Sequence, residues 1–327
     1  MVKLGLKILA GAGAIVGLCW ILVFLPTPMT TGYAVLQDIC GHGDWLYHRI
    51  EEDTRPVDVA FIGSSLTMCG IHDSLLTAAV GSRLQKNVQV ANLGTCFFGR
   101  DMHLMMVQRL LTHRQPSHVV LEVRTKENKG LNKSFYKLAK GKEYYSGSWA
   151  HTLTNADVQK QTWKGARVQL RRYLSQQLGF DSAQIDYDTT GYLHRFRGKQ
   201  TMRSEQIPAK RTLKEIPNDL IKGTEFKLSQ STGKHYLEKI RDLLHENGVR
   251  FILLYYPTYP DHPEQQPMLQ SYYESIADEV WLPPSDIFEP EGHFMDPQHL
   301  NGRGGWALSR WLVDPLSQSL VAIVHED

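Results

Sequence analysis

Short, mostly apolar runs separated by stretches of helical length constrain the fold of this chain more than any other feature. The runs are Val57–Ile62, Asn87–Leu93, His118–Val123, Val249–Tyr256 and the shorter Val280–Pro283. Strands that are apolar on both faces are typical of parallel sheets covered by helices on both sides. We therefore predict an α/β fold: a three-layer, flavodoxin-like domain with a mostly parallel sheet.

Helices are expected between these runs, because parallel strands need right-handed crossover connections. The predicted helices are Tyr33–Leu36, Asp73–Leu84, Met102–His113, Asp157–Gln177, Gly233–Asn247, Pro267–Ala277 and Leu300–Leu312.

Residues 125–230 interrupt the alternation of strands and helices. This segment is too long for a simple loop, so we predict an inserted subdomain between two parts of the α/β domain, residues 56–124 and 231–327. It contains twice as many Lys and Arg as Asp and Glu residues. Such a basic segment can bind an anionic partner, or it can be a solvated surface. The formal net charge of the whole chain is only +2, which gives no case for a nucleic-acid partner.

The chain begins with an almost uninterrupted apolar stretch over residues 4–25. About 20 helical residues span a hydrocarbon core of about 30 Å. A cleaved signal peptide is the alternative, but the stretch is longer than a usual signal core and no small-residue cleavage site follows it. We therefore predict a single-pass anchor in the cytoplasmic membrane within residues 1–29, followed by a polar connector at 30–55. Lys3 and Lys7 precede the span, which predicts a cytoplasmic N-terminus and an extracytoplasmic, periplasmic body.

Three cysteines lie beyond the apolar stretch, at Cys40, Cys69 and Cys96. Cys69 and Cys96 follow the first and second predicted strands, whose loops are neighbours in a parallel sheet. A Cys69–Cys96 disulfide is possible in an oxidising compartment, and two buried thiols are the alternative. No CxxC spacing suggests zinc.

The first strand ends at Gly63-Ser64-Ser65. Gly63 permits a sharp turn into a helix, whose N-terminus offers N–H groups and the positive end of a dipole. This is a suitable place for a serine nucleophile, although the same geometry also suits phosphate binding.

A second motif, Asp296-x-x-His299, precedes the last predicted helix. A serine nucleophile needs an imidazole to take its proton and a carboxylate to orient that imidazole. The alternatives are an Asp-Pro turn that caps the helix, and a metal cluster that includes His293. No further ligand is evident, so we expect no metal and no cofactor.

These motifs together resemble the SGNH (GDSL-like) hydrolase superfamily. The resemblance covers roughly residues 57–124 and 249–312, and it implies a Ser65–His299–Asp296 triad with the N–H groups of Ser65 and Gly94 in the oxyanion hole. Gly94 ends the second strand as Asn92-Leu93-Gly94, and Asn301 follows the histidine as an asparagine often does in this superfamily.

The chain departs from the family pattern after the third strand. The family usually has a Gly-x-Asn-Asp block there, whose asparagine completes the oxyanion hole. Here Glu122 or Arg124 occupies that region, and Asn128 comes too late to align. Loss of one oxyanion donor typically costs about 2.7–4 kcal/mol of transition-state stabilisation.

The chain looks most like the membrane-anchored branch of this superfamily, which includes the D-alanine transfer protein of teichoic-acid synthesis and proteins of exopolysaccharide O-acetylation. The resemblance implies an O-acyltransferase that works with a membrane-bound O-acyltransferase partner on a polysaccharide or wall-polymer acceptor. An esterase with the same triad and a non-catalytic envelope scaffold are the alternatives. Arg124, Asn301 and Tyr256 are the expected substrate contacts, although the Tyr-Pro-rich segment 255–260 could equally be a packed loop.

Overall fold

A single parallel sheet forms the centre of the molecule. The structure, a computed structural model, describes residues 14, 17–18, 21–124, 131–145, 155–179, 232–256, 266–288, 291–296 and 298–322. Within these residues, five strands lie in the order β2-β1-β3-β4-β5, and every adjacent pair is parallel. The strands are β1 Val59–Gly63, β2 Val90–Gly94, β3 His118–Val123, β4 Arg250–Tyr255 and β5 Glu279–Trp281. The predicted α/β class and parallel sheet are confirmed, and the strand order is that of flavodoxin-like sheets.

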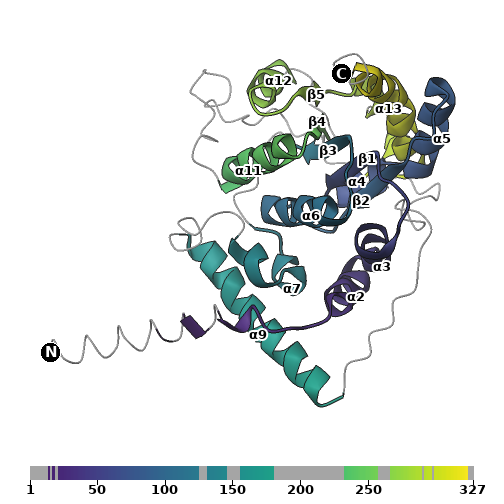
Figure 1. Ribbon diagram of the computed structural model, residues 1–327. Coiled ribbons are helices and arrows are strands. Elements are labelled where there is room, and N and C mark those ends of the chain that lie inside the picture. Colours follow the sequence, from purple (N-terminus) through teal and green to yellow (C-terminus); the bar gives the residue numbers. More distant parts are fainter. Residues whose placement is uncertain are drawn as a thin grey trace.

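Helices cover both faces of the sheet (Figure 1). Alternate strand residues enter two separate apolar clusters: Ala60 and Ile62 belong to one, Val59 and Phe61 to the other. The first cluster is covered by α6 Arg100–His113 and α11 Thr232–Glu246, and the second by α4 Ser65–Gly70, α5 Asp73–Leu84 and α13 Gly302–Ala322. A further helix, α12 Gln266–Glu274, contacts β5. This is the three-layer arrangement that the apolar strands predict.

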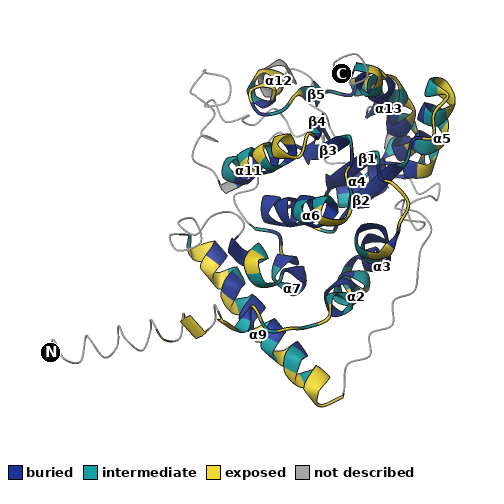
Figure 2. Cartoon of the chain, viewed as in Figure 1, coloured by how far each residue is buried: buried dark blue, intermediate teal, exposed yellow. Residues whose placement is uncertain are grey.

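Additional helices lie beyond α6, on its far side from the sheet (Figure 1). Residues 30–55 were expected to be a polar connector with one short helix. The structure instead has three helical elements here, whose side chains Tyr33, Trp45 and Ile50 are buried in the core. Figure 2 shows buried and partly buried residues along α2 and α3. Parts of the predicted insertion pack against them. The elements are α2 Met29–Cys40, α3 Gly43–Tyr47, the π-helix η1 His48–Glu52, α7 Phe135–Leu138, the 3-10 helix η2 Gly141–Tyr145 and α9 Ala156–Gln177.

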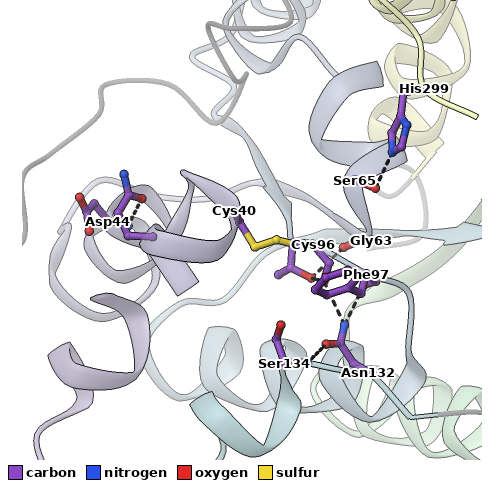
Figure 3. Close-up of a disulfide and its surroundings, with 11 residues drawn as sticks. Cys40, Asp44, Gly63, Ser65, Cys96, Phe97, Asn132, Ser134 and His299 are labelled. Carbon is purple, nitrogen blue, oxygen red and sulfur yellow. Dashed lines mark hydrogen bonds between the residues drawn. A yellow bond between two sulfur atoms is a disulfide. The ribbon is translucent and has the colours of Figure 1, made fainter. Parts of the chain in front are cut away.

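The possible Cys69–Cys96 disulfide is wrong, because Cys96 pairs with Cys40 instead, with Cα atoms 5.6 Å apart. Cys40 is the last residue of α2, and α2 packs close enough to the loop after β2 to present it to Cys96 (Figure 3). Cys69 is buried in α4, outside the disulfide. The correct pairing depends on the position of α2, which the local sequence pattern does not reveal.

Most of the predicted membrane anchor, residues 4–25, lies outside the described residues. Among the residues that are described, none of the helices is long and apolar enough to cross a bilayer.

Candidate active site

Ser65 is the first residue of α4, directly after β1. Ser64 is extended, and its Oγ accepts the Leu66 N–H at 3.1 Å as the helix N-cap. The turn has no room for a side chain at Gly63, where a Cβ would lie 1.9 Å from Thr67 Oγ1. The strand therefore turns tightly into the helix and presents Ser65 at the carboxyl end of β1, as predicted.

Ser65, His299 and Asp296 form a continuous hydrogen-bonded chain. Ser65 Oγ lies 2.8 Å from His299 Nε2, and His299 Nδ1 lies 2.7 Å from Asp296 Oδ2. Figure 3 shows the His299 ring directed at Ser65, although the two residues are 234 positions apart in the sequence. If His299 Nδ1 carries the proton that it donates to Asp296, Nε2 is the acceptor for the serine hydroxyl.

The Asp296 carboxylate is also held by the backbone of its own turn. Its Oδ1 accepts the N–H groups of Gln298 at 2.8 Å and His299 at 2.9 Å. Burial raises the pKa of Asp296, but the hydrogen bonds and positive charge from His299, with these two N–H groups, outweigh it and lower the pKa below the ordinary 3.8. Asp296 is therefore ionised at neutral pH.

Asn301 shapes the loop that carries Asp296 and His299. Its Nδ2 donates to the Gly292 carbonyl at 2.7 Å, and its Oδ1 accepts the N–H groups of Arg303 and Gly304 in the first turn of α13. The side chain is buried. These contacts give Asn301 a structural role as the cap of α13, and its contact with substrate stays a prediction.

Glu122, the fifth residue of β3, lies buried beneath the Ser64–Ser65 turn. Its carboxylate accepts the Ser64 N–H at 2.7 Å, both hydroxyls of Ser64 and Thr67 at 2.9 Å, and the Thr67 N–H at 3.3 Å. Arg124 Nε completes the set at 2.7 Å. Burial raises the pKa of Glu122, but the charge of Arg124 and these hydrogen bonds prevail and lower the pKa to about 2. A buried anion therefore holds the turn that presents Ser65, the candidate nucleophile.

Arg124 lies between this anion and the β2–α6 loop. Its Nη2 donates to Ser64 Oγ at 2.6 Å, and its guanidinium stacks over Phe98 at 4.6 Å. Glu122 and Arg124 thus both contact the nucleophile turn, in the region where the family asparagine block was expected. Asn128 lies outside the described residues.

The two predicted oxyanion donors have different surroundings. The Gly94 N–H donates to Asn92 Oδ1 at 3.0 Å, so that proton is already used inside the protein. A Cβ on Gly94 would lie 2.6 Å from the Met68 nitrogen, so Gly94 lets α4 pack closely on β2. The Ser65 N–H belongs to the first turn of α4, where backbone donors and the helix dipole favour a developing negative charge.

Two asparagines that the sequence reasoning did not select support the site. Asn92 Nδ2 donates to the carbonyls of Thr67 at 3.1 Å and Ile71 at 2.8 Å, which joins β2 to α4. Asn132, from the insertion, donates to the Phe97 carbonyl at 2.7 Å (Figure 3). The sequence could have indicated a structural role for Asn92, because it is a polar residue near the end of a mostly apolar strand. No sequence pattern indicates such a role for Asn132.

Two other predicted positions have contacts with residues outside the triad. Tyr256 is buried against α4: a Cβ on Gly70 would lie 2.9 Å from its ring, and burial raises its pKa well above the ordinary value. Residues 257–260 lie outside the described part. His293 Nδ1 donates to the Ile287 carbonyl at 2.6 Å, and no cluster of three metal-ligating side chains occurs among the described residues.

Comparison of the chain with models of known protein families and with curated proteins finds no match in either. The geometry therefore carries the functional inference. The site has a serine at a helix N-terminus, hydrogen-bonded to an imidazole that is in turn hydrogen-bonded to an ionised carboxylate. This arrangement is suited to acyl transfer through a covalent serine ester.

Proposed function

We propose that this protein is a serine acyltransferase of the SGNH type, anchored in the cytoplasmic membrane with its catalytic domain outside. It moves an acyl group to a hydroxyl of a cell-envelope polysaccharide or wall polymer. The observation that carries the proposal is the Ser65–His299–Asp296 chain, with contacts of 2.8 and 2.7 Å. The resemblance of the motifs to the anchored branch of the superfamily supports the choice of acceptor.

In the first half-reaction His299 Nε2 takes the Ser65 hydroxyl proton as Oγ attacks the acyl carbonyl. The protonated imidazole is stabilised by Asp296, and it then gives its proton to the leaving group as the acyl-serine ester forms. In the second half-reaction His299 takes the proton of the acceptor hydroxyl as its oxygen attacks the ester carbonyl, and the imidazolium then returns a proton to Ser65 Oγ as the ester bond to Ser65 breaks. The Ser65 N–H and the N-terminal end of α4 stabilise the oxyanion in both steps.

The choice of acceptor separates transfer from hydrolysis. With water in place of the polymer hydroxyl, the same steps make the protein an esterase. A membrane-bound O-acyltransferase partner would supply the acyl group in the transferase reaction. A non-catalytic scaffold would have no need of a Ser65 hydroxyl within hydrogen-bonding distance of an imidazole.

The enzyme proposal is tested by labelling the protein with a fluorophosphonate and locating the adduct by mass spectrometry. We expect one adduct on Ser65, absent from Ser65→Ala and retained by Ser271→Ala, which removes an exposed serine on α12. Absence of an adduct on Ser65 in the folded protein would rule out both the transferase and the esterase and would favour a scaffold.

Transfer and hydrolysis are then separated by a chase of the acyl-enzyme. The acylated protein is formed with an activated acetyl ester and mixed with buffer alone or with a polysaccharide rich in free hydroxyls. Faster loss of the acyl group with polymer, together with acetylated polymer, supports transfer. Equal rates and free acetate identify an esterase.

A further inference from the structure

Helix α9 has one buried face and one exposed face. Small or polar residues such as Thr162, Gly165 and Gln169 are buried on the side of α9 that faces α7 and η2. The opposite face is formed by residues three or four positions apart, which lie in one stripe along the helix. We call this stripe the α9 outer face; it consists of Lys160, Trp163, Lys164, Arg167, Arg171, Leu174 and, one residue past the helix, Leu178.

The composition of the α9 outer face is unusual for a surface that meets only water. Four of its members are cations, three are large apolar residues, and none is acidic. Trp163 is 47% exposed, Leu174 49% and Leu178 67%. Figure 2 shows exposed residues along the outer side of α9. Helices that lie in the membrane interface combine basic residues with Trp and Leu in this way.

The start of the described chain is fixed to the same subdomain. Thr27 Oγ1 donates to Gln169 Oε1 at 2.6 Å, and the Gly141 N–H donates to the Val23 carbonyl at 2.9 Å. The exposed ring of Phe24 stacks on Tyr145 with ring centres 6.0 Å apart. The segment that joins the predicted anchor to the body is therefore held against η2 and the buried face of α9, so the chain leaves this subdomain beside α9 on its way to the predicted anchor.

A basic groove continues this surface towards α2. It has a volume of about 420 Å³ and lies between α2 and α9. Its walls combine the apolar side chains of Val35 and Val168 with the cations Lys137 and Arg171. Cations above an apolar wall suit a phosphate headgroup attached to a hydrocarbon chain.

We propose that the α9 outer face lies on the membrane surface and binds anionic phospholipid headgroups. This face would be a second membrane contact beside the predicted anchor. The proposal does not depend on whether Ser65, His299 and Asp296 are catalytic. The cations attract the headgroups, while Trp163, Leu174 and Leu178 enter the interface. Because two contacts fix the orientation of a rigid body better than one, the face holds the catalytic domain at a set angle above the membrane.

Photocrosslinking from the α9 outer face tests the proposal on the full chain. Trp163→p-benzoylphenylalanine is reconstituted in vesicles of phosphatidylcholine alone or mixed with phosphatidylglycerol, and lipid adducts are detected by mass spectrometry. Trp306→p-benzoylphenylalanine is the matched control, because Trp306 is also 47% exposed but lies on α13. We expect a phosphatidylglycerol adduct at position 163, and little or none at position 306.

Charge reversal separates headgroup binding from chance proximity. One basic residue is worth about a fivefold factor in binding to an anionic surface. The triple change Lys160→Glu, Arg167→Glu and Arg171→Glu is therefore expected to lower the adduct yield at least about tenfold. A control triple, Lys86→Glu, Lys239→Glu and Arg310→Glu, changes the total charge equally at exposed sites elsewhere and leaves the yield unchanged.

Four results would overturn the proposal. The first is an equal lipid adduct at positions 163 and 306. The second is a yield at 163 that does not depend on phosphatidylglycerol. The third is displacement of the lipid adduct by polygalacturonate at equal charge concentration, which would identify a docking face for an anionic polymer. Failure of the protein to float with the vesicles would overturn both this proposal and the predicted anchor.

Discussion

Asp296 and Glu122 are both ionised carboxylates, but they stabilise different parts of the site. Asp296 is partly exposed and contacts the imidazole of His299, the proposed general base. Glu122 is buried, and its carboxylate is bonded to the Ser64–Ser65 turn and to Arg124. Replacement of the first should therefore affect the reaction with little effect on folding, and replacement of the second should affect folding first.

For Asp296→Asn we expect the rate of acylation by an activated ester to fall by about 10³–10⁴-fold. The amide can still accept the N–H groups of Gln298 and His299, but it no longer stabilises a protonated imidazole or selects its tautomer. Pre-steady-state acylation rates measure the effect, with the unfolding midpoint as a control for folding. A loss of less than tenfold with an intact fold would show that Asp296 does not assist His299.

For Glu122→Gln we expect a loss of about 3–5 kcal/mol in the free energy of unfolding at pH 7, because Arg124 loses its buried partner. The pKa of Glu122 falls from 4.5 to about 2 on folding, so its ionisation stabilises the protein above pH 4.5 and this contribution is lost as the pH falls towards 2.

Urea unfolding at several pH values measures this effect. The difference between wild type and Glu122→Gln should shrink as the pH falls from neutral towards 3. Glu274→Gln, at an exposed position on α12, is the control and should show no such trend. A difference that is constant over this pH range would mean that the Glu122 charge is not what stabilises the turn.

At the scale of elements, the sequence predicts the buried and regular parts well. The five strands lie within about three residues of their predicted bounds, because apolar runs between turn residues are strong signals. The helices of residues 30–55 were mostly missed. Leu46 and Ile50 have helical spacing, but α3 and η1 are only five residues long each, too short for a period to be recognised, and η1 is a π-helix. The Cys40–Cys96 pairing was missed because it depends on where α2 packs.

The disulfide should stabilise the attachment of α2 to the β2–α6 loop. Cys40 and Cys96 are 56 residues apart, and closing a loop of that size typically contributes about 2–4 kcal/mol. Cys40→Ser should lose about this much in the free energy of unfolding, and its stability should no longer respond to reductant. Cys69→Ala should keep its sensitivity to reductant, since Cys69 is outside the bond. Equal sensitivity in wild type and Cys40→Ser would contradict the pairing.

At the scale of the whole molecule, the candidate site lies where the carboxyl ends of the strands meet. Strand order changes direction at β1, between β2 and β3, and ligands in such sheets bind beside that point. Because both motifs lie at this edge of the sheet, they were enough to predict that Ser65, His299 and Asp296 lie together. The sequence could not show that the Gly94 N–H is used by Asn92, because that bond depends on the packing of α4 on β2.

The redox state of the disulfide tests the prediction that the body of the protein lies outside the cytoplasm. Structural disulfides persist in oxidising compartments and are rare in the cytosol. If the body is extracytoplasmic, Cys40 and Cys96 should be fully oxidised in growing cells. Trapping free thiols with an alkylating reagent before lysis, followed by peptide mass spectrometry, measures this. Alkylated Cys40 and Cys96 in folded protein would contradict the proposed location.

Under the proposed mechanism, the distance in sequence between Ser65 and His299 also determines when the protein can first react with an acyl donor. The two residues are 234 positions apart, and a ribosome adds about 5–20 residues per second, so His299 follows Ser65 by on the order of 10–50 s. During that interval the nascent chain already carries the serine but has no base to activate it. Under the proposed mechanism, reactivity thus arises only after all five described strands have been synthesised, so Ser65 of a nascent chain stays unactivated until the sheet can form.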